Sequence, residues 1–400
     1  MSILLIGVGY FPFLTAGEKN FFFHLLPILK EQTDVSVLSL NDSVESVLQQ
    51  GTAAGDITVY CARRPFHRNY GRFHFRGDGY TTYHHRHKPS QEIVEKSVSI
   101  VVQLPRLRRI IHQHKIQVVH FMDNFGPVMP LLGRIFPHVK VTYSAANYEP
   151  RGRQSVYDAY LRLSIGFLDG AGVYTQAYLS RLREIGIRVP LRITRWGVPE
   201  VDQELPAERK RVIRQGLGIK DKQRFFLWSG YLQQIQERDF YRTVEVARQV
   251  VQAGCNAAFV FAFKPETFRP EYVQEAGDCI QVVNGVKNFR AVLETADLFL
   301  SPIGNSRSTV SPPLTWLEAM SMGTPVITTA VGGVDEVITS GQTGYVASSY
   351  DNLVDVVIEA SRNDSLATMS RRAREFVRET FNIQRSAEAH LQFWREMTTT

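Results

Sequence analysis

The chain has little cysteine, with three residues in 400, namely Cys61, Cys255 and Cys279. An odd number of cysteines without metal-ligand spacing argues against a disulfide framework or a zinc site, so buried free thiols are expected. No run approaches the roughly 20 apolar residues that a membrane span requires. The apolar segment SILLIGV near the start lacks the basic flank of a signal peptide. We therefore expect it to be a first β-strand, in a cytoplasmic protein.

Acidic residues are scarce in the first half of the chain. Residues 1–200 hold 24 Lys and Arg against 15 Asp and Glu, a net charge of +9, whereas residues 201–400 hold 22 against 24, a net charge of −2. This asymmetry predicts that the two halves face different partners. An anionic ligand, a membrane surface or a nucleic acid would suit the first half.

Short apolar segments alternate with helical patterns along the whole chain, which is typical of parallel sheets with helices on both faces. The expected strands are Ile3–Val8, Val35–Ser39, Ile57–Tyr60, Val118–Phe121, Val139–Tyr143 and Gly170–Tyr174, then Phe225–Trp228, Ala258–Phe263, Ile280–Val283, Asp297–Leu300 and Val326–Thr329. A chain of 400 residues exceeds what one core usually organises. The pattern therefore predicts an α/β protein with two doubly wound domains.

The pattern is interrupted between Trp196 and Glu204, where Gly197 and Pro199 precede a charged helical segment. Ligands of such sheets bind beyond the carboxyl ends of the strands, so two facing domains would form a two-sided pocket. The expected domains are residues 1–198 and 199–380, with a helix over 381–400 that packs back toward the first domain.

One helix is bounded by its own capping residues. Ser311 suits the N-cap, Pro312 the first helical position and Gly323 the residue just past the end, which predicts about three helical turns. Leu314, Leu317 and Met320 form its apolar stripe, and Glu318 is its one carboxylate.

Two segments are strongly basic. Arg63–Lys88 holds seven Lys or Arg, five His and six Phe or Tyr but one acid, which predicts a long surface loop. Pro105–Lys115 has helical apolar spacing, which favours an ordinary crossover helix with a solvated face over a helix that touches a membrane.

The run LEAMSMGTPVITTAVGGVDEVITSGQTGYV, which includes Glu318, resembles the donor-site signature of retaining glycosyltransferases of the GT-B fold, family 4, also described as glycosyl transferases group 1. GVGYFPFLTAGEKNFFFHLL, VVHFMDNFG, REIGIRVPLRITRWGVPE and FNIQRSAEAHLQFW resemble the same family in order and spacing. The resemblance covers nearly the whole chain. It implies two Rossmann-like domains, with the acceptor on the first and a nucleotide-sugar donor on the second.

The resemblance also implies transfer with retention of the anomeric configuration, without a metal or another cofactor. Glu318 matches the glutamate that binds the nucleotide ribose, and Gly17 matches a glycine loop that approaches the donor phosphates. A surface glutamate and a plain tight turn are the alternatives. The donor pocket would further include Gly230, Gly285, Val310, Leu314 and Thr315.

The sequence departs from the family at the groups that handle the diphosphate. Val310 replaces the first glutamate of the pair, and Tyr231 and about Gln236 replace an arginine and a lysine. Ser311, Pro312 and Pro313 replace a glycine-rich approach to the helix, and prolines provide no N–H group for an anion. We therefore considered Arg238 and Arg307 as substitute cations for the leaving phosphate, with solvated arginines as the alternative.

On the acceptor side, His120 and Asp123 close a buried strand, where such sheets place functional side chains. The family's sugar-contacting histidine lies two positions later, at Met122, so a core role for His120 is the alternative. Asn147 and Tyr148 are further acceptor-binding candidates. The acceptor is expected to be anionic or membrane-associated, at a peripheral position on the membrane surface, and a homo- or hetero-oligomer is compatible with the sequence.

Three functions stay open at this stage. The leading hypothesis is a glycosyltransferase with an altered donor pocket. The second is a catalytically silent GT-B subunit that binds a partner glycosyltransferase. The third is nucleic-acid binding through Arg63–Lys88, which is the least favoured because the loop belongs to a complete two-domain enzyme scaffold.

Overall fold

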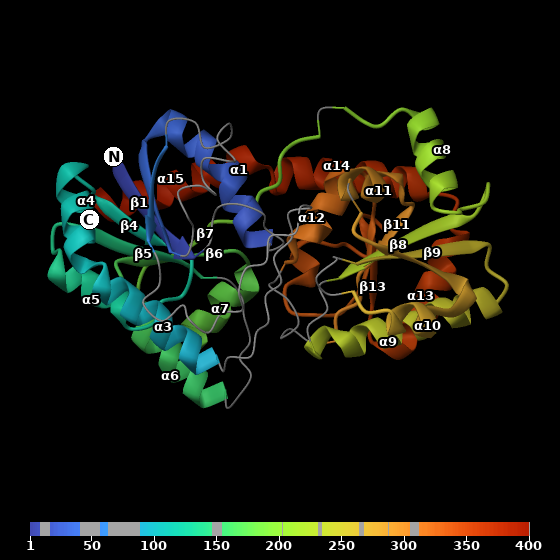
Figure 1. The fold of residues 1–400 in the computed structure, drawn as a ribbon, viewed down its shortest axis with the longest axis horizontal. Coiled ribbons are helices and arrows are strands. Elements are labelled where there is room, and N and C mark those ends of the chain that lie inside the picture. The colour runs from blue at the N-terminus through green and yellow to red at the C-terminus, as the bar shows by residue number, and fades with distance from the viewer. Residues whose placement is uncertain are drawn as a thin grey trace. The chain divides into compact units, whose positions relative to one another are not determined.

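In the computed structural model the chain forms two units, each built around one parallel β-sheet (Figure 1). Unit 1 comprises Met1–Gly197 and Ile383–Thr400, and unit 2 comprises Val198–Asn382. The structure describes residues 1–8, 17–40, 57–62, 89–145, 154–201, 203–230, 234–263, 268–286, 288–304 and 312–399. The carboxyl-terminal residues thus return to the unit in which the chain begins.

The sheet of unit 1 has seven strands, all paired in parallel. Their spatial order is β3 (Thr58–Ala62), β2 (Asp34–Leu40), β1 (Ser2–Val8), β4 (Val118–Phe121), β5 (Lys140–Ala145), β6 (Gly170–Val173) and β7 (Leu191–Ile193). The chain moves outward from β1 in one direction and then, from β4, in the other. This reversal makes the sheet doubly wound.

Helices cover both faces of this sheet. They are α1 (Gly17–Gln32), α3 (Pro89–Val102), α4 (Leu104–Gln113), α5 (Val128–Ile135), α6 (Gln154–Ile165), α7 (Gln176–Glu184) and α15 (Ile383–Thr399). The helices α1 and α15 pack together on one face, while α3 to α6 cover the other (Figure 1). On α4 the residues Leu107, Ile110 and Ile111 are buried and Arg108 and Arg109 are exposed, as the apolar spacing predicted.

An aromatic cluster attaches α15 to unit 1. The indole of Trp394 is fully buried and its Nε1–H donates to Nδ1 of His120 on β4 at 3.1 Å. The hydroxyl of Ser386 donates to the carbonyl of Arg195 at 2.6 Å, which holds the start of the helix. A Cβ at Gly197 would lie 2.6 Å from Cα of Ile383, so the two chain segments approach as closely as only glycine permits.

Two histidines in this cluster are fully buried and stay neutral. Burial lowers the pKa of His120 well below its usual range, and His390 lowers it further. Burial likewise lowers the pKa of His390 to about 4, although the hydrogen bond from its Nδ1 to the Ser386 carbonyl opposes the shift. Nε2 of His390 is buried and has no hydrogen-bond partner within the described parts of the chain.

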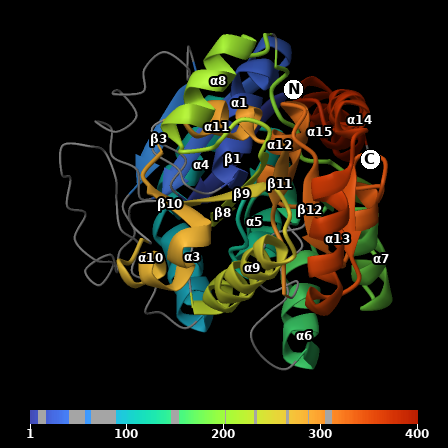
Figure 2. The ribbon, with the colours of Figure 1, turned by 90° about the vertical axis from the view of Figure 1, so that its right-hand side faces the viewer.

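The sheet of unit 2 has six parallel strands. Their order is β10 (Ile280–Asn284), β9 (Ala257–Phe263), β8 (Arg224–Gly230), β11 (Leu298–Leu300), β12 (Val326–Thr329) and β13 (Gly344–Ala347). Its helices are α8 (Ala207–Gly216), α9 (Gln234–Gln252), α10 (Glu271–Ala276), α11 (Phe289–Thr295), α12 (Leu314–Ser321), α13 (Tyr350–Arg362) and α14 (Leu366–Thr380), with short 3₁₀ turns at Gly277–Cys279 and Val334–Glu336. The helices α9, α10 and α13 cover one face, and α8, α11 and α12 cover the other, where α14 packs on α12 (Figure 1, Figure 2).

The α/β fold with two parallel sheets is confirmed, and two of its strands were missed. No strand was predicted at Leu191–Ile193 or at Gly344–Ala347. The expected start of the donor helix was also wrong. Pro313 is the N-cap and Leu314 the first helical residue, so α12 is eight residues long and Pro312 precedes it.

We expect the unfolding free energy to fall as the pH is lowered from about 6.5 to about 4. A histidine whose pKa is lowered in the folded state binds its proton more readily when unfolded, so stability is present above pH 6.5 and lost below it. The slope for one such histidine is at most about 1.4 kcal/mol per pH unit. Urea unfolding of the wild type and His390→Leu across this range would measure it. The exposed His112→Leu is the control, and an unchanged slope in His390→Leu would refute the assignment.

Candidate functional site

The carboxyl edge of the unit 2 sheet gathers most of the donor-site residues predicted from the sequence. Gly230 ends β8, and Gly285 directly follows β10, with φ of 70° and its N–H donating to the carbonyl of Phe263 at the end of β9. Leu314 and Thr315 begin α12, which lies between β11 and β12 in the chain. Parallel sheets bind their ligands at this edge.

Hydroxyl groups at the end of β12 hold the chain that leaves β11. Oγ1 of Thr328 donates to the carbonyl of Ser301 at 2.8 Å, and Oγ1 of Thr329 both accepts from the N–H of Ile303 at 2.9 Å and donates to its carbonyl at 2.5 Å. Nε1 of Trp316 on α12 donates to Oγ of Ser301 at 2.9 Å. The segment 301–303 is therefore fixed from two neighbouring elements.

Asp239 on α9 fixes the next residue, and sequence reasoning missed it. It is 8% exposed, and its Oδ2 accepts from the N–H of Gly304 at 3.1 Å. A Cβ at Gly304 would clash with Oδ1 of the same carboxylate, so glycine permits this approach. Burial raises the pKa of the Tyr350 phenol above its usual range, and the Asp239 carboxylate adds to the rise. The sequence signal that could have identified Asp239 is a carboxylate next to Phe240 on the buried side of a helix.

The helix α12 carries Glu318 and ends as predicted. Glu318 is half-buried on a helix whose other side chains are mostly buried. Gly323 has φ of 78° just past the end of the helix, its N–H donates to Met320, and the N–H of Thr324 donates to Ala319. This pair of bonds is a Schellman motif, and it turns the chain directly into β12.

The start of α12 provides fewer backbone donors than an ordinary helix. Pro313 at the N-cap has no N–H, and the N–H of Trp316 donates to the Pro313 carbonyl at 3.0 Å. The N–H groups of Leu314 and Thr315 are the donors of the first turn. They are suited to one phosphate oxygen rather than to a whole diphosphate.

Of the two predicted substitute cations, Arg238 lies within the described residues. Arg238 is exposed in the second turn of α9, beside Asp239 and at the same edge as Gly230. Arg307, Val310, Ser311 and Tyr231 lie outside the described residues, as does the Arg63–Lys88 loop. Gln236 lies on α9, and the structure does not describe its side chain.

In unit 1 the structure places His120 in the core. Its ring has no exposed surface, and Nδ1 lies 2.9 Å from Oγ1 of Thr142 while Nε2 lies 2.9 Å from Oγ of Ser144. Because Trp394 donates to Nδ1, the proton of the neutral ring is on Nε2. A ring held in this way does not reach an acceptor, so the alternative core role fits and the catalytic role does not.

The other acceptor-side candidates are only partly described. Asp123, two residues past β4, is 3.7 Å from Nζ of Lys96 on α3, and both side chains are largely buried. Gly17 is the first residue of α1. Asn147 and Tyr148 lie outside the described residues. Asp123 therefore lies in the segment after β4, and Gly17 lies at the start of α1. The hydrogen bonds of the His120 ring go to Thr142, Ser144 and Trp394.

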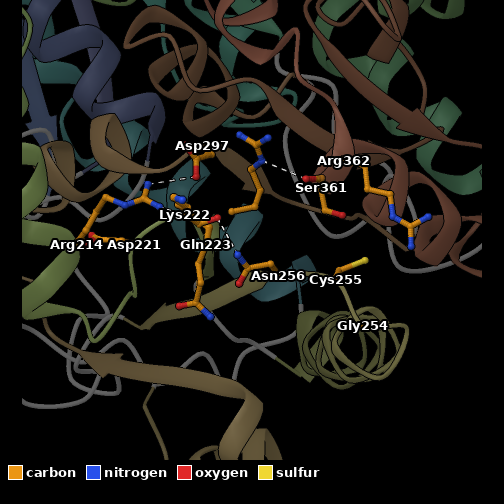
Figure 3. Close-up of a pocket in the computed structure, with 11 residues that line it drawn as sticks. Arg214, Asp221, Lys222, Gln223, Gly254, Cys255, Asn256, Asp297, Ser361 and Arg362 are labelled. Atoms are coloured by element: carbon orange, nitrogen blue, oxygen red, sulfur yellow. Dashed lines mark hydrogen bonds and ion pairs between the residues drawn. The ribbon is translucent and has the colours of Figure 1, made fainter.

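A polar pocket of about 510 Å³ lies at the opposite, amino edge of the unit 2 sheet (Figure 3). Nη1 of Arg214 is 3.2 Å from Oδ2 of Asp297, and the guanidinium of Arg224 donates to the carbonyls of Ser361 and Asn363 at the end of α13. Cations at helix carboxyl ends complement the partial negative charge there. These arginines therefore have a structural role, away from the candidate donor site.

The described residues include neither a metal-binding cluster nor a membrane-spanning helix. No group of three or more His, Cys, Asp and Glu side chains among them is placed to hold a metal ion. None of the helices formed by these residues combines the length and apolar character that a membrane crossing needs.

Sequence comparisons match parts of the chain to a family model and to curated relatives. Residues 223–363 match the model of the family described as Glycosyl transferases group 1. A segment of 101 residues is 35% identical to a glycosyltransferase named for colanic acid biosynthesis, WcaL of Salmonella typhimurium, and covers 24% of this chain and 25% of that protein. A segment of 75 residues is 41% identical to N-acetyl-alpha-D-glucosaminyl L-malate synthase of Bacillus anthracis, covering 18% of this chain and 20% of that protein. The matches thus span about a quarter or less of these relatives.

Solved structures resemble the chain over its full length. Anabaena Alr3699/HepE, in complex with UDP and glucose, has a TM-score of 0.70 at 13% identity and covers 99% of this chain and 100% of its own. Sucrose-phosphate synthase of Thermosynechococcus elongatus has a TM-score of 0.72 at 16% identity, and the alignment covers 100% of this chain and 99% of that protein. At such identities the likeness shows the fold.

The two parallel sheets agree with the likeness to solved glycosyltransferases over 98–99% of this chain. The family match lies within unit 2. The chain has the GT-B fold, and its residues 223–363 match the model of the glycosyl transferases group 1 family.

Proposed function

We propose that this protein is a glycosyltransferase that moves a sugar from a nucleotide-sugar donor to an acceptor hydroxyl, with retention of configuration and without a metal. The donor would bind at the carboxyl edge of the unit 2 sheet, and the acceptor would bind unit 1. The observation that carries the proposal is Glu318, half-buried on α12, the helix that begins at that edge, within the family-matched residues.

Several contacts support a donor site at this edge. Thr328, Thr329, Trp316 and Asp239 fix residues 301–304, which lead toward α12. A carboxylate on a rigid helix suits two adjacent ribose hydroxyls, because it accepts two hydrogen bonds in a fixed geometry. HepE has been solved with UDP and with UDP-glucose, so uridine nucleotides are the first donors to test.

Charge at the diphosphate decides whether the site is active. With Tyr231 and Gln236 in place of cations, the leaving phosphate needs another positive group, because transfer without a metal leaves its charge to the protein. Arg238 is exposed at the same edge and is the described arginine that we assign to this role. Arg307 is the second candidate from the sequence.

A catalytically silent subunit remains the alternative function. Val310 at the position of the family's first glutamate and the prolines before α12 both favour it. Such a subunit would have lost nucleotide binding or would bind the nucleotide without transfer. Binding and turnover must therefore be measured separately.

We expect Glu318→Ala to abolish the thermal stabilisation that a uridine diphosphate sugar provides. A ligand at 100 times its dissociation constant stabilises the fold by about 2.7 kcal/mol. The wild-type midpoint should therefore rise by several degrees. Differential scanning fluorimetry with a panel of nucleoside diphosphates and nucleotide sugars measures this shift.

Glu375→Ala is the matched control, because Glu375 is an exposed glutamate on α14 of the same unit. It should keep the wild-type shift. If Glu318→Ala kept the shift as well, Glu318 would not bind the donor. If no nucleotide stabilised the wild type, the silent-subunit alternative would be favoured.

Arg238→Ala should lower kcat on the order of a hundredfold, since it removes a cation that acts on the leaving group in the transition state. Arg238→Lys should retain part of the rate because it keeps the charge. Arg248→Ala, at the other end of α9, is the control. Equal kcat values for Arg238→Ala and Arg248→Ala would assign the role to another cation.

The anomeric configuration of the product should match that of the donor. Proton NMR of the glycosylated product reads its anomeric configuration directly. An inverted product would disprove retention, which is inherited from the family resemblance. It would leave the donor-site assignment intact.

A further inference from the structure

Three helices of unit 1 are apolar on both sides. Their inner sides pack on the sheet through buried residues such as Ile100, Met129 and Leu161. Twelve large apolar side chains are exposed in the described part of the chain, and eight of them lie on α3, on α5, or on α6 and the turn that follows it. These eight residues, called here the outer face, are Val94, Val101, Val102, Leu131, Ile135, Val156, Leu163 and Phe167.

The spacing shows that these residues form stripes. Leu131 and Ile135 are four residues apart on α5, and Val156 and Leu163 are seven apart on α6, while Phe167 lies in the turn after α6. Residues with these spacings share one side of a helix. The helix α5 packs against both α3 and α6, so the three helices that carry these residues are neighbours on one side of unit 1 (Figure 1).

Scattered exposed apolar residues need no explanation, but a contiguous set marks an interaction surface. Val156 is 66% exposed and Phe167 65%, so these side chains are not partly covered residues at the edge of the core. Unit 2, by comparison, exposes Val212, Tyr241, Val251 and Val273 on α8, α9 and α10. The concentration on α3, α5 and α6 is thus specific to unit 1.

On α5 and α6 the charge next to the outer face is positive, whereas α3 carries Glu92 and Glu95 against Lys96. The helix α5 has no acidic residue and carries Arg134, which is exposed beside Leu131 and Ile135. The helix α6 has one acid, Asp158, whose two oxygens accept from Nη2 of Arg181 at 2.8 and 2.9 Å. Arg162 is exposed beside Leu163, and residues 1–200 carry a net charge of +9.

We infer that the outer face binds the surface of an anionic lipid bilayer. Aliphatic and aromatic side chains with arginines beside them match a membrane interface, where the former enter the acyl boundary and the latter meet anionic headgroups. The helices lie on the surface of unit 1 and need not span the bilayer to bind it. The inference does not depend on the donor chemistry, although a membrane position would bring the protein to a lipid-linked acceptor.

Vesicle sedimentation of the full chain tests this inference. The wild type should bind vesicles of phosphatidylcholine mixed with phosphatidylglycerol and bind phosphatidylcholine vesicles more weakly. The double variant Leu131→Ser/Leu163→Ser should lower the partition coefficient about tenfold or more, because it removes apolar surface from the lipid contact. Val212→Ser/Val273→Ser removes similarly exposed apolar side chains from unit 2 and should bind like the wild type.

The charge is tested separately. Arg134→Glu should weaken binding to the anionic vesicles and remove much of its salt dependence, whereas Arg371→Glu, an exposed arginine on α14, should not. Circular dichroism and the thermal midpoint verify that each variant is folded.

Three outcomes would overturn the inference. The first is that the wild type does not bind anionic vesicles. The second is that the unit 1 and unit 2 double variants lose vesicle binding equally. The third is that the wild type forms a dimer and does not bind vesicles, and that Leu131→Ser/Leu163→Ser dissociates this dimer. The last outcome, read by sedimentation velocity, would make the outer face an interface between copies of this chain. The nucleotide-binding assay gives its own result in each case, so failure here leaves the proposed function standing.

Discussion

Parallel strand pairing is the constraint on which the candidate donor site depends. It places the carboxyl ends of β8, β9, β10, β11 and β12 at one edge of the unit 2 sheet and the carboxyl ends of most helices at the other. The two edges therefore need opposite chemistry. At the amino edge, Arg224 and Arg214 donate to carbonyls at the ends of α13 and α11. At the carboxyl edge, Asp239 and the threonines of β12 accept from and donate to the backbone of residues 301–304.

The amino-edge pocket illustrates why a cavity is weak support for a site by itself. It contains four cations and two acids, but Arg214 is paired with Asp297 and Arg224 satisfies helix carbonyls. Each of these bonds has a structural reason, because an unpaired helix end is costly when it is even partly buried. The carboxyl edge is the better candidate since its side chains position a loop and a helix that carry Glu318.

Sequence patterns predicted the elements whose residues are apolar on both faces. The strands β4 and β12 were predicted at their observed bounds, because VVHF and VITT are buried runs next to clear helical patterns. The strand β7 was missed because it is three residues long, with the exposed Arg192 at its centre. The strand β13 was missed because it begins with Gly344, which resembles a turn residue, although the absent Cβ is what allows it to lie against the Val326 carbonyl.

The functional residues were harder to predict than the fold, for a physical reason. His120 has the sequence context of a residue at a strand end, and its burial becomes evident only when α15, 274 residues away, brings Trp394 onto its ring. Asp239 has the context of a surface acid, and its role depends on the approach of Gly304, which lies in the segment after β11. Both contacts join distant parts of the chain, and local periodicity contains no information on such pairs. The helix of Glu318 and its glycine C-terminus were predicted because they are contiguous in sequence with the following strand, although the start of the helix was misplaced.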